Sequence, residues 1–126
     1  MKGRILVVDD EAGIRHLLQT GLTDEGYSVT TANRTMDALA VLENASFDLA
    51  IIDLMLPDVD GLQLAEAIRM LDPATYVILI TAYGTPSFES MASHPAIMHY
   101  LHKPFAFDRL LALIRQCLGN QKTSDV

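Results

Sequence analysis

The stretch DLAIIDLMLPDVDG, from Asp48 to Gly61, decides the fold of this chain. Its apolar run at residues 49–52 is short, rich in β-forming residues and not alternating, which predicts a strand buried on both faces of a parallel sheet. The run ends on Asp53, and a loop of turn-forming residues follows it up to Gly61. A carboxylate at the end of a buried strand is costly unless a partner meets it. The rest of the sequence must therefore supply a partner for Asp53.

Length and composition indicate one domain with a single apolar core. The chain has 126 residues, of which 50% are hydrophobic. Its net charge of −7 disfavours direct binding to nucleic acid or to an anionic membrane surface. A single cysteine, Cys117, excludes an intrachain disulfide and fits a reducing, cytoplasmic location. No apolar segment has the pattern of a signal peptide or the length of a membrane-spanning helix.

Strand patterns alternate with helix patterns along the whole chain. Besides the central strand, we predict strands at residues 5–8, 27–32, 76–80 and 96–101, and the more polar run at 27–32 suits an edge strand. Helices are predicted at 14–26, 35–43, 62–71, 86–94 and 107–118, and the helix at 62–71 is expected to bury Leu62, Leu64, Ala65, Ile68 and Leu71. This alternation predicts an α/β fold, a doubly wound five-stranded parallel sheet of flavodoxin-like order 2-1-3-4-5 with five surrounding helices. Residues 1–118 form this domain, and residues 119–126 form a polar C-terminal tail or linker stub.

Polar residues follow four of the five predicted strands. Asp9 and Asp10 follow the first strand, Asp53 ends the third, Thr81 follows the fourth and Lys103 follows the fifth. Ligands of such sheets bind beyond the carboxyl ends of the strands, so these side chains should converge. Crowded carboxylates require a cation, and hard oxygen ligands suit Mg²⁺. A carboxylate nucleophile, a divalent cation, a lysine and a hydroxyl are together the components of phosphoryl transfer.

Four motifs, in this order and at these separations, resemble the receiver domain of two-component response regulators over residues 1–118. They are VVDDE (7–11), DLMLPDVDG (53–61), LITAYG (79–84) and YLHKPF (100–105). The resemblance implies that Asp53 accepts a phosphoryl group from a histidine kinase or a histidine phosphotransfer protein. It also implies that Asp10, Asp53 and the backbone carbonyl of Met55 bind Mg²⁺ directly, while Asp9 acts mainly through water.

The resemblance assigns the remaining roles as well. Lys103 would contact the acceptor carboxylate and then the phosphoryl oxygens, and Thr81 would move to hydrogen-bond the phosphoryl group. Tyr100 would turn inward as Thr81 vacates its space, and Pro104 would follow a cis bond. A downstream effector or a second copy of the chain would dock on the fourth helix, fifth strand and fifth helix. The domain would not be an enzyme but a phosphoacceptor signalling domain that takes part in its own phosphorylation and dephosphorylation.

One segment of the chain departs from the family pattern, and two positions beside the site carry side chains that bear on the lifetime of the phosphorylated form. The segment 86–96 is serine-rich and carries Pro95, which puts the relay to a partner in question. The two positions that flank the path of attacking water are Met55 and Tyr83, and neither carries an acid or an amide. We therefore expect a long-lived phosphorylated form. Asp58 and Asp60 are expected to face solvent in the loop.

Three other functions are open to a chain of this pattern. A Mg²⁺-dependent phosphatase with an aspartyl-phosphate intermediate would need an acid two residues after its nucleophile, where Met55 stands. A flavin carrier of the same topology would need a phosphate-binding loop after Val8, where acids stand instead. A receiver that binds partners without phosphorylation is disfavoured because all the positions of the site are filled.

Overall fold

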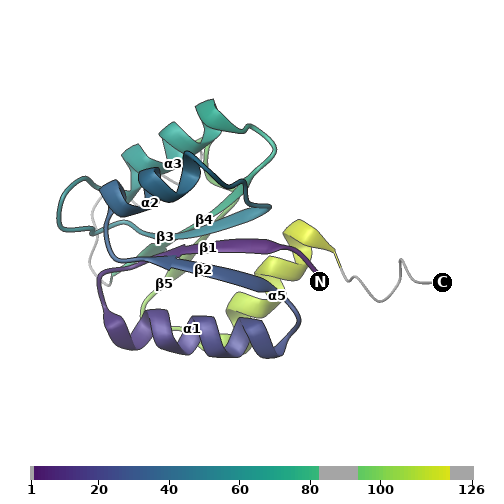
Figure 1. Cartoon of the computed structure of the whole chain (residues 1–126). Helices are drawn as coiled ribbons and strands as arrows, with labels where there is room; N and C mark the ends of the chain where they lie inside the picture. The colour runs from purple at the N-terminus through teal and green to yellow at the C-terminus, as the bar shows by residue number, and fades with distance from the viewer. Residues whose placement is uncertain (1, 83–93, 120–126) are drawn as a thin grey trace.

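Nine elements form the fold in the computed structural model, which describes residues 2–82 and 94–119 (Figure 1). In chain order they are β1 (Arg4–Val8), α1 (Ala12–Asp24), β2 (Ser28–Ala32), α2 (Thr35–Leu42), β3 (Leu49–Asp53), α3 (Gly61–Leu71), β4 (Tyr76–Thr81), β5 (His99–His102) and α5 (Phe107–Leu118). The helix predicted at 86–94 falls outside the described residues except for its last residue. In the described part of the chain, no helix has the length and apolar character needed to cross a membrane.

All neighbouring strands are parallel, and their order is β2-β1-β3-β4-β5. This order confirms the predicted doubly wound sheet and places β2 at an edge, as its polar sequence indicated. β3 is the central strand, and all five of its residues are buried. The unbroken apolar run that precedes Asp53 is therefore explained by two covered faces.

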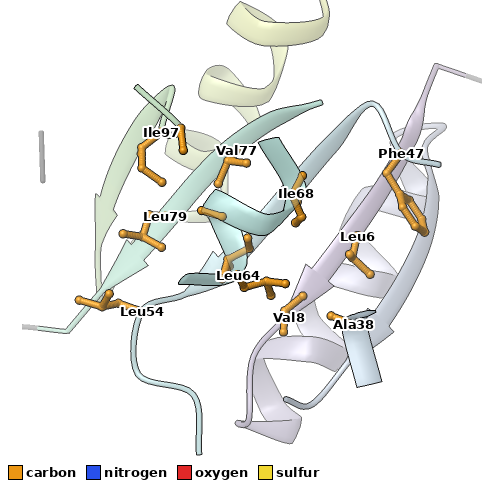
Figure 2. Close-up of a cluster of buried hydrophobic side chains, with 14 of the residues drawn as sticks. Leu6, Val8, Ala38, Phe47, Leu54, Leu64, Ile68, Val77, Leu79 and Ile97 are labelled. Atoms are coloured by element: carbon orange, nitrogen blue, oxygen red, sulfur yellow. The ribbon is translucent and has the colours of Figure 1, made fainter. Parts of the chain in front are cut away.

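Each face of the sheet has its own apolar core. Helices α2 and α3 cover one face, where Leu6, Val8 and Leu79 meet Leu64 and Ile68 (Figure 2). Helices α1 and α5 cover the opposite face, as Figure 1 shows. Because successive side chains of a strand point to opposite faces, every strand contributes to both cores.

The fifth strand and the burial of Leu71 differ most from the prediction, whereas the other described strands and helices begin and end within two residues of their predicted bounds. The fifth strand begins at His99 and not at residue 96, because a turn closed by the Ile97 N–H and the His94 carbonyl (3.1 Å) occupies the preceding residues. It ends one residue later than predicted, at His102. Leu71 was predicted to be buried but is 64% exposed, because it is the last residue of α3 and lies beyond the helix positions that face the sheet.

Candidate functional site

The carboxyl ends of β1, β3, β4 and β5 bring together the residues predicted to form the site. Asp9 and Asp10 directly follow β1, Asp53 ends β3, Thr81 ends β4, and Lys103 follows β5. The register aligns these ends, because Val8 of β1 pairs with Ile52 of β3 and Asp53 pairs with Ile80 of β4. The convergence follows from the parallel topology, in which all strands end at one edge.

Three carboxylates form the centre of the site. Asp9, Asp10 and Asp53 each offer an oxygen within 4.8 Å of the others. Asp9 and Asp53 are buried, with 1% and 4% of their surface exposed, whereas Asp10 is exposed. Backbone N–H groups hold the two buried carboxylates, since Glu11 donates to Asp9 Oδ1 (2.9 Å) and Met55 donates to Asp53 Oδ1 (3.0 Å).

The environment of Asp9 is suited to a cation. Burial, together with the nearby charge of Asp53, raises the pKa of the Asp9 carboxyl, although the Glu11 N–H and Lys103 act in the opposite direction. Asp9 Oδ2 is buried and accepts no hydrogen bond among the described residues, and its one close partner is the Lys103 ammonium at 3.1 Å. A divalent cation would satisfy this oxygen and relieve the repulsion between the carboxylates. The donor set consists of hard oxygen atoms, which fits Mg²⁺.

Lys103 is the positive charge of the site. Its Nζ lies 2.9 Å from Asp53 Oδ2, 3.1 Å from Asp9 Oδ2 and 2.5 Å from Glu11 Oε2. Burial would lower the pKa of Lys103, but its contacts with Glu11, Asp53 and Asp9 outweigh burial and raise the pKa, so the ammonium stays charged. The contact with Glu11 is a feature that the sequence analysis did not assign. The signal for it was the third acid in the run after β1.

Thr81 and Tyr100 lie on the same side of the sheet. Thr81 is fully buried, and its Oγ1 is 3.4 Å from Nδ1 of His102, its partner across β4 and β5. Tyr100 is partly buried and packs against the core beneath α2 and α3. Burial raises the pKa of the Tyr100 hydroxyl, and a hydrogen bond with the His94 backbone offsets part of this effect.

The peptide bond between Lys103 and Pro104 is cis, which confirms the expectation. Tyr83 lies outside the described residues.

The loop after Asp53 is held at both ends. Leu54 donates its N–H to the Ile80 carbonyl and accepts from the Gly61 N–H, both at 2.8 Å. Asp60 caps α3 by accepting from the Gln63 N–H (3.0 Å). Asp58 and Asp60 are exposed, as predicted, but each carboxylate also binds the start of a helix, which the sequence analysis missed.

Comparison with known proteins agrees with this geometry. The family model of the response regulator receiver domain matches residues 5–115. The transcriptional regulatory protein YkoG of Bacillus subtilis is 36% identical over 99% of this chain, and GlrR of Escherichia coli is 38% identical over 90% of it. This chain covers only 56% of YkoG and 26% of GlrR, so these relatives are longer proteins.

Solved structures of receiver domains resemble this chain in both fold and sequence. The response regulator TrrA of Thermotoga maritima, solved in complex with Mg²⁺-BeF, has a TM-score of 0.80 and 37% identity, and the match covers 91% of this chain and 98% of TrrA. A receiver domain protein of Methanospirillum hungatei has a TM-score of 0.86 and 33% identity, with 96% and 97% of the two chains covered. Fold, site and sequence thus agree, and the chain belongs to the response regulator receiver domain family of two-component signalling proteins.

Proposed function

We propose that this domain is a phosphorylatable switch in which Asp53 accepts a phosphoryl group from a histidine kinase or a histidine phosphotransfer protein. The observation that carries the proposal is the setting of the Asp53 carboxylate at the end of the central strand. One oxygen is held by the Met55 N–H and the other contacts the Lys103 ammonium at 2.9 Å. Such a carboxylate is oriented, and its negative charge is partly balanced, before a donor arrives.

The reaction transfers the phosphoryl group from a donor histidine to Asp53. A bond forms between an Asp53 oxygen and phosphorus while the bond between phosphorus and the donor nitrogen breaks. The imidazole keeps the electron pair of that bond and takes up a proton. Lys103 would then contact the phosphoryl oxygens, and the Thr81 hydroxyl would exchange its contact with His102 for one of these oxygens.

Asp9, Asp10, Asp53 and the backbone carbonyl of Met55 are the groups that would hold Mg²⁺. When bound, the cation would offset the negative charge of the phosphoryl oxygens and of the carboxylates. The buried Asp9 Oδ2, which accepts no hydrogen bond from the described residues and lies 3.1 Å from the Lys103 ammonium, supports this assignment. The presence of Mg²⁺-BeF in the TrrA structure supports it as well.

The signal would leave the domain through β5 and its neighbours. Thr81 and Tyr100 lie on β4 and β5, on one side of the sheet, so movement of Thr81 would change the space open to Tyr100. The output surface would comprise β5, α5 and the helix predicted at 86–94. Its partners would be a downstream effector or a second copy of the chain, in the cytoplasm, with no direct contact between this domain and nucleic acid.

Acetyl phosphate with Mg²⁺ tests the acceptor. Intact mass of the wild-type chain should increase by one phosphoryl group, and Asp53→Asn should abolish the addition. Asp48→Asn is the matched control. Asp48 lies just before the amino end of β3, far from the site, and its carboxylate accepts a hydrogen bond from the Arg4 N–H. Unchanged labelling of Asp53→Asn, or loss of labelling in Asp48→Asn as well, would contradict the assignment.

A further inference from the structure

The loop after Asp53 is tied to the first turn of α2, which lies more than 20 residues earlier in the chain. Asp58 Oδ1 accepts a hydrogen bond from the Thr35 N–H (3.0 Å), and Asp58 Oδ2 accepts one from the Met36 N–H (2.9 Å). In return, the Thr35 hydroxyl donates to the Val59 carbonyl at 2.8 Å. We call these three contacts the loop clamp.

The loop clamp completes a helix that does not cap itself. The first N–H groups of a helix have no partner within it, and the residue at the N-cap position of α2, Arg34, provides no side-chain cap. The Asp58 carboxylate takes this place from another segment, and its negative charge suits the positive end of α2. Desolvation would raise the pKa of Asp58, but hydrogen bonds from the N–H groups of Met36, Thr35 and Val59 outweigh it and lower the pKa.

The loop clamp also fixes the middle of the loop. The ends of the loop are held by the Leu54 contacts and by the Asp60 cap of α3. The middle of the loop begins at Met55, whose N–H binds Asp53 Oδ1 (3.0 Å) and which is 64% exposed. The clamp connects this middle part to a helix that packs on the core through the fully buried Ala38. Thr35 is itself 3% exposed, so the loop is joined to a buried and well-packed position.

We propose that Asp58 and Thr35 are positioning residues for the metal site. This inference rests on the proposed function, in which Mg²⁺ is bound partly by the Met55 backbone carbonyl. A carbonyl on a free loop must be ordered when the cation binds, and this ordering costs conformational entropy. Mg²⁺ also requires nearly ideal octahedral geometry. By ordering the loop in advance, Asp58 and Thr35 strengthen Mg²⁺ binding although neither provides a ligand.

The chain contains matched controls near the amino ends of the strands, at the other end of the sheet from the site. Asp48 Oδ2 accepts the Arg4 N–H at 2.8 Å, and the Thr75 hydroxyl donates to the Phe47 carbonyl at 2.8 Å. These contacts repeat the two bond types of the loop clamp and also join segments distant in sequence. They lie near the amino ends of the strands, away from the site. Loss of them should affect stability without affecting the metal site.

The experiment is a Mg²⁺ titration of the 126-residue chain, in which NMR chemical shifts of the amide groups report binding. It is carried out at a temperature where every variant is folded. Thr35→Val and Asp58→Asn should raise the Mg²⁺ Kd by about tenfold, the lower end of the range for groups that orient metal ligands. Thr75→Val and Asp48→Asn should leave it within about twofold of wild type, because distant sites act independently. Thr35→Ser keeps the hydroxyl and should restore most of the affinity. Amide hydrogen exchange at Met55 should be faster in the two clamp variants alone.

Three results would count against the inference. If the clamp variants bind Mg²⁺ as tightly as wild type, the clamp does not position the site. If Thr75→Val and Asp48→Asn weaken Mg²⁺ binding as much as the clamp variants do, the effect is one of general stability. If the wild-type chain shows no saturable shift at Asp10, Asp53 or Met55, the proposed metal site fails first, and this inference fails with it.

Discussion

Gly61, the first residue of α3, lies so close to the end of β3 that it has no room for a side chain. A Cβ at this position would overlap the Asp53 carbonyl oxygen and lie 2.9 Å from Ile52 Cγ2. Gly61→Ala should therefore push the start of α3 away from the acceptor strand and lower the free energy of unfolding by about 1–3 kcal/mol. Urea denaturation measures this change, and labelling by acetyl phosphate should slow in parallel.

Gly13 is the control for this substitution. A Cβ at Gly13, in the first turn of α1, meets no atom within 4 Å. Gly13→Ala should raise the free energy of unfolding by about 0.5 kcal/mol, because alanine restricts the unfolded chain and fits the helix. Equal losses for both substitutions would show that close approach at Gly61 is not the cause.

Met55 should set the lifetime of the phosphorylated form. It lies two residues after Asp53, is largely exposed, and carries no group that orients water. Met55→Asn should speed the loss of the phosphoryl group by about 10²-fold, the lower end of what a positioned polar group contributes. Decay of phospho-Asp53 after removal of the donor measures this rate. Met70→Asn, on the exposed side of α3, should decay as wild type does, and rapid decay of wild type without acceleration in Met55→Asn would refute the prediction.

At the scale of an element, α5 contributes a thiol at the margin of its buried face. Cys117 packs against the core beneath α1 and α5, and burial raises the pKa of its thiol from 9.0 to about 11. The unfolded chain therefore ionises first. The free energy of unfolding should fall as the pH rises from 9 towards 11, and below pH 9 the full contribution is present.

Comparison with Cys117→Ala isolates this contribution. Packing loss in the variant shifts its stability by an amount independent of pH, so the difference between the two pH profiles reports the thiol alone. Reaction with a disulfide reagent should be slow in the native chain and fast in urea. Parallel pH profiles for wild type and Cys117→Ala would contradict a buried thiol.

The sequence predicted elements better than it predicted the contacts between their ends. An unbroken apolar run places a strand at residues 49–52, because burial on two faces leaves only apolar residues there. The same pattern cannot reveal that Asp58 binds α2 or that Glu11 reaches Lys103, since such contacts depend on how loops meet in space. The error at Leu71 has a similar cause: a helical stripe does not show where the helix runs beyond the sheet.

At the scale of the whole molecule, Mg²⁺ and folding should be linked. A cation that binds only the native state raises stability by about 1.4 kcal/mol at ten times its Kd. Asp10→Ala should remove the rise of Tm with Mg²⁺, because it deletes a proposed ligand from an exposed position that packing does not depend on. A variant that still responds fully to Mg²⁺ would refute the ligand set.

Asp9→Asn tests the cost in stability of the crowded carboxylates when the cation is absent. Burial and the charge of Asp53 disfavour the Asp9 carboxylate, whereas an asparagine can still accept the Glu11 N–H. The variant should be more stable than wild type in EDTA by about 1 kcal/mol and should lose this advantage when Mg²⁺ is added. Thermal unfolding in EDTA and in Mg²⁺ measures both effects.

The wide spacing of the site along the chain has a consequence during synthesis. Asp9 and Asp10 are synthesised before any helix of the domain, whereas Lys103 follows β5, the last strand of the sheet. A nascent chain that lacks β5 has Asp53 at the end of β3 but not the Lys103 ammonium that contacts it, so we expect no phosphorylation of such a chain. We therefore expect competence for phosphorylation to appear only after β5 and Lys103 have been synthesised and joined to the sheet.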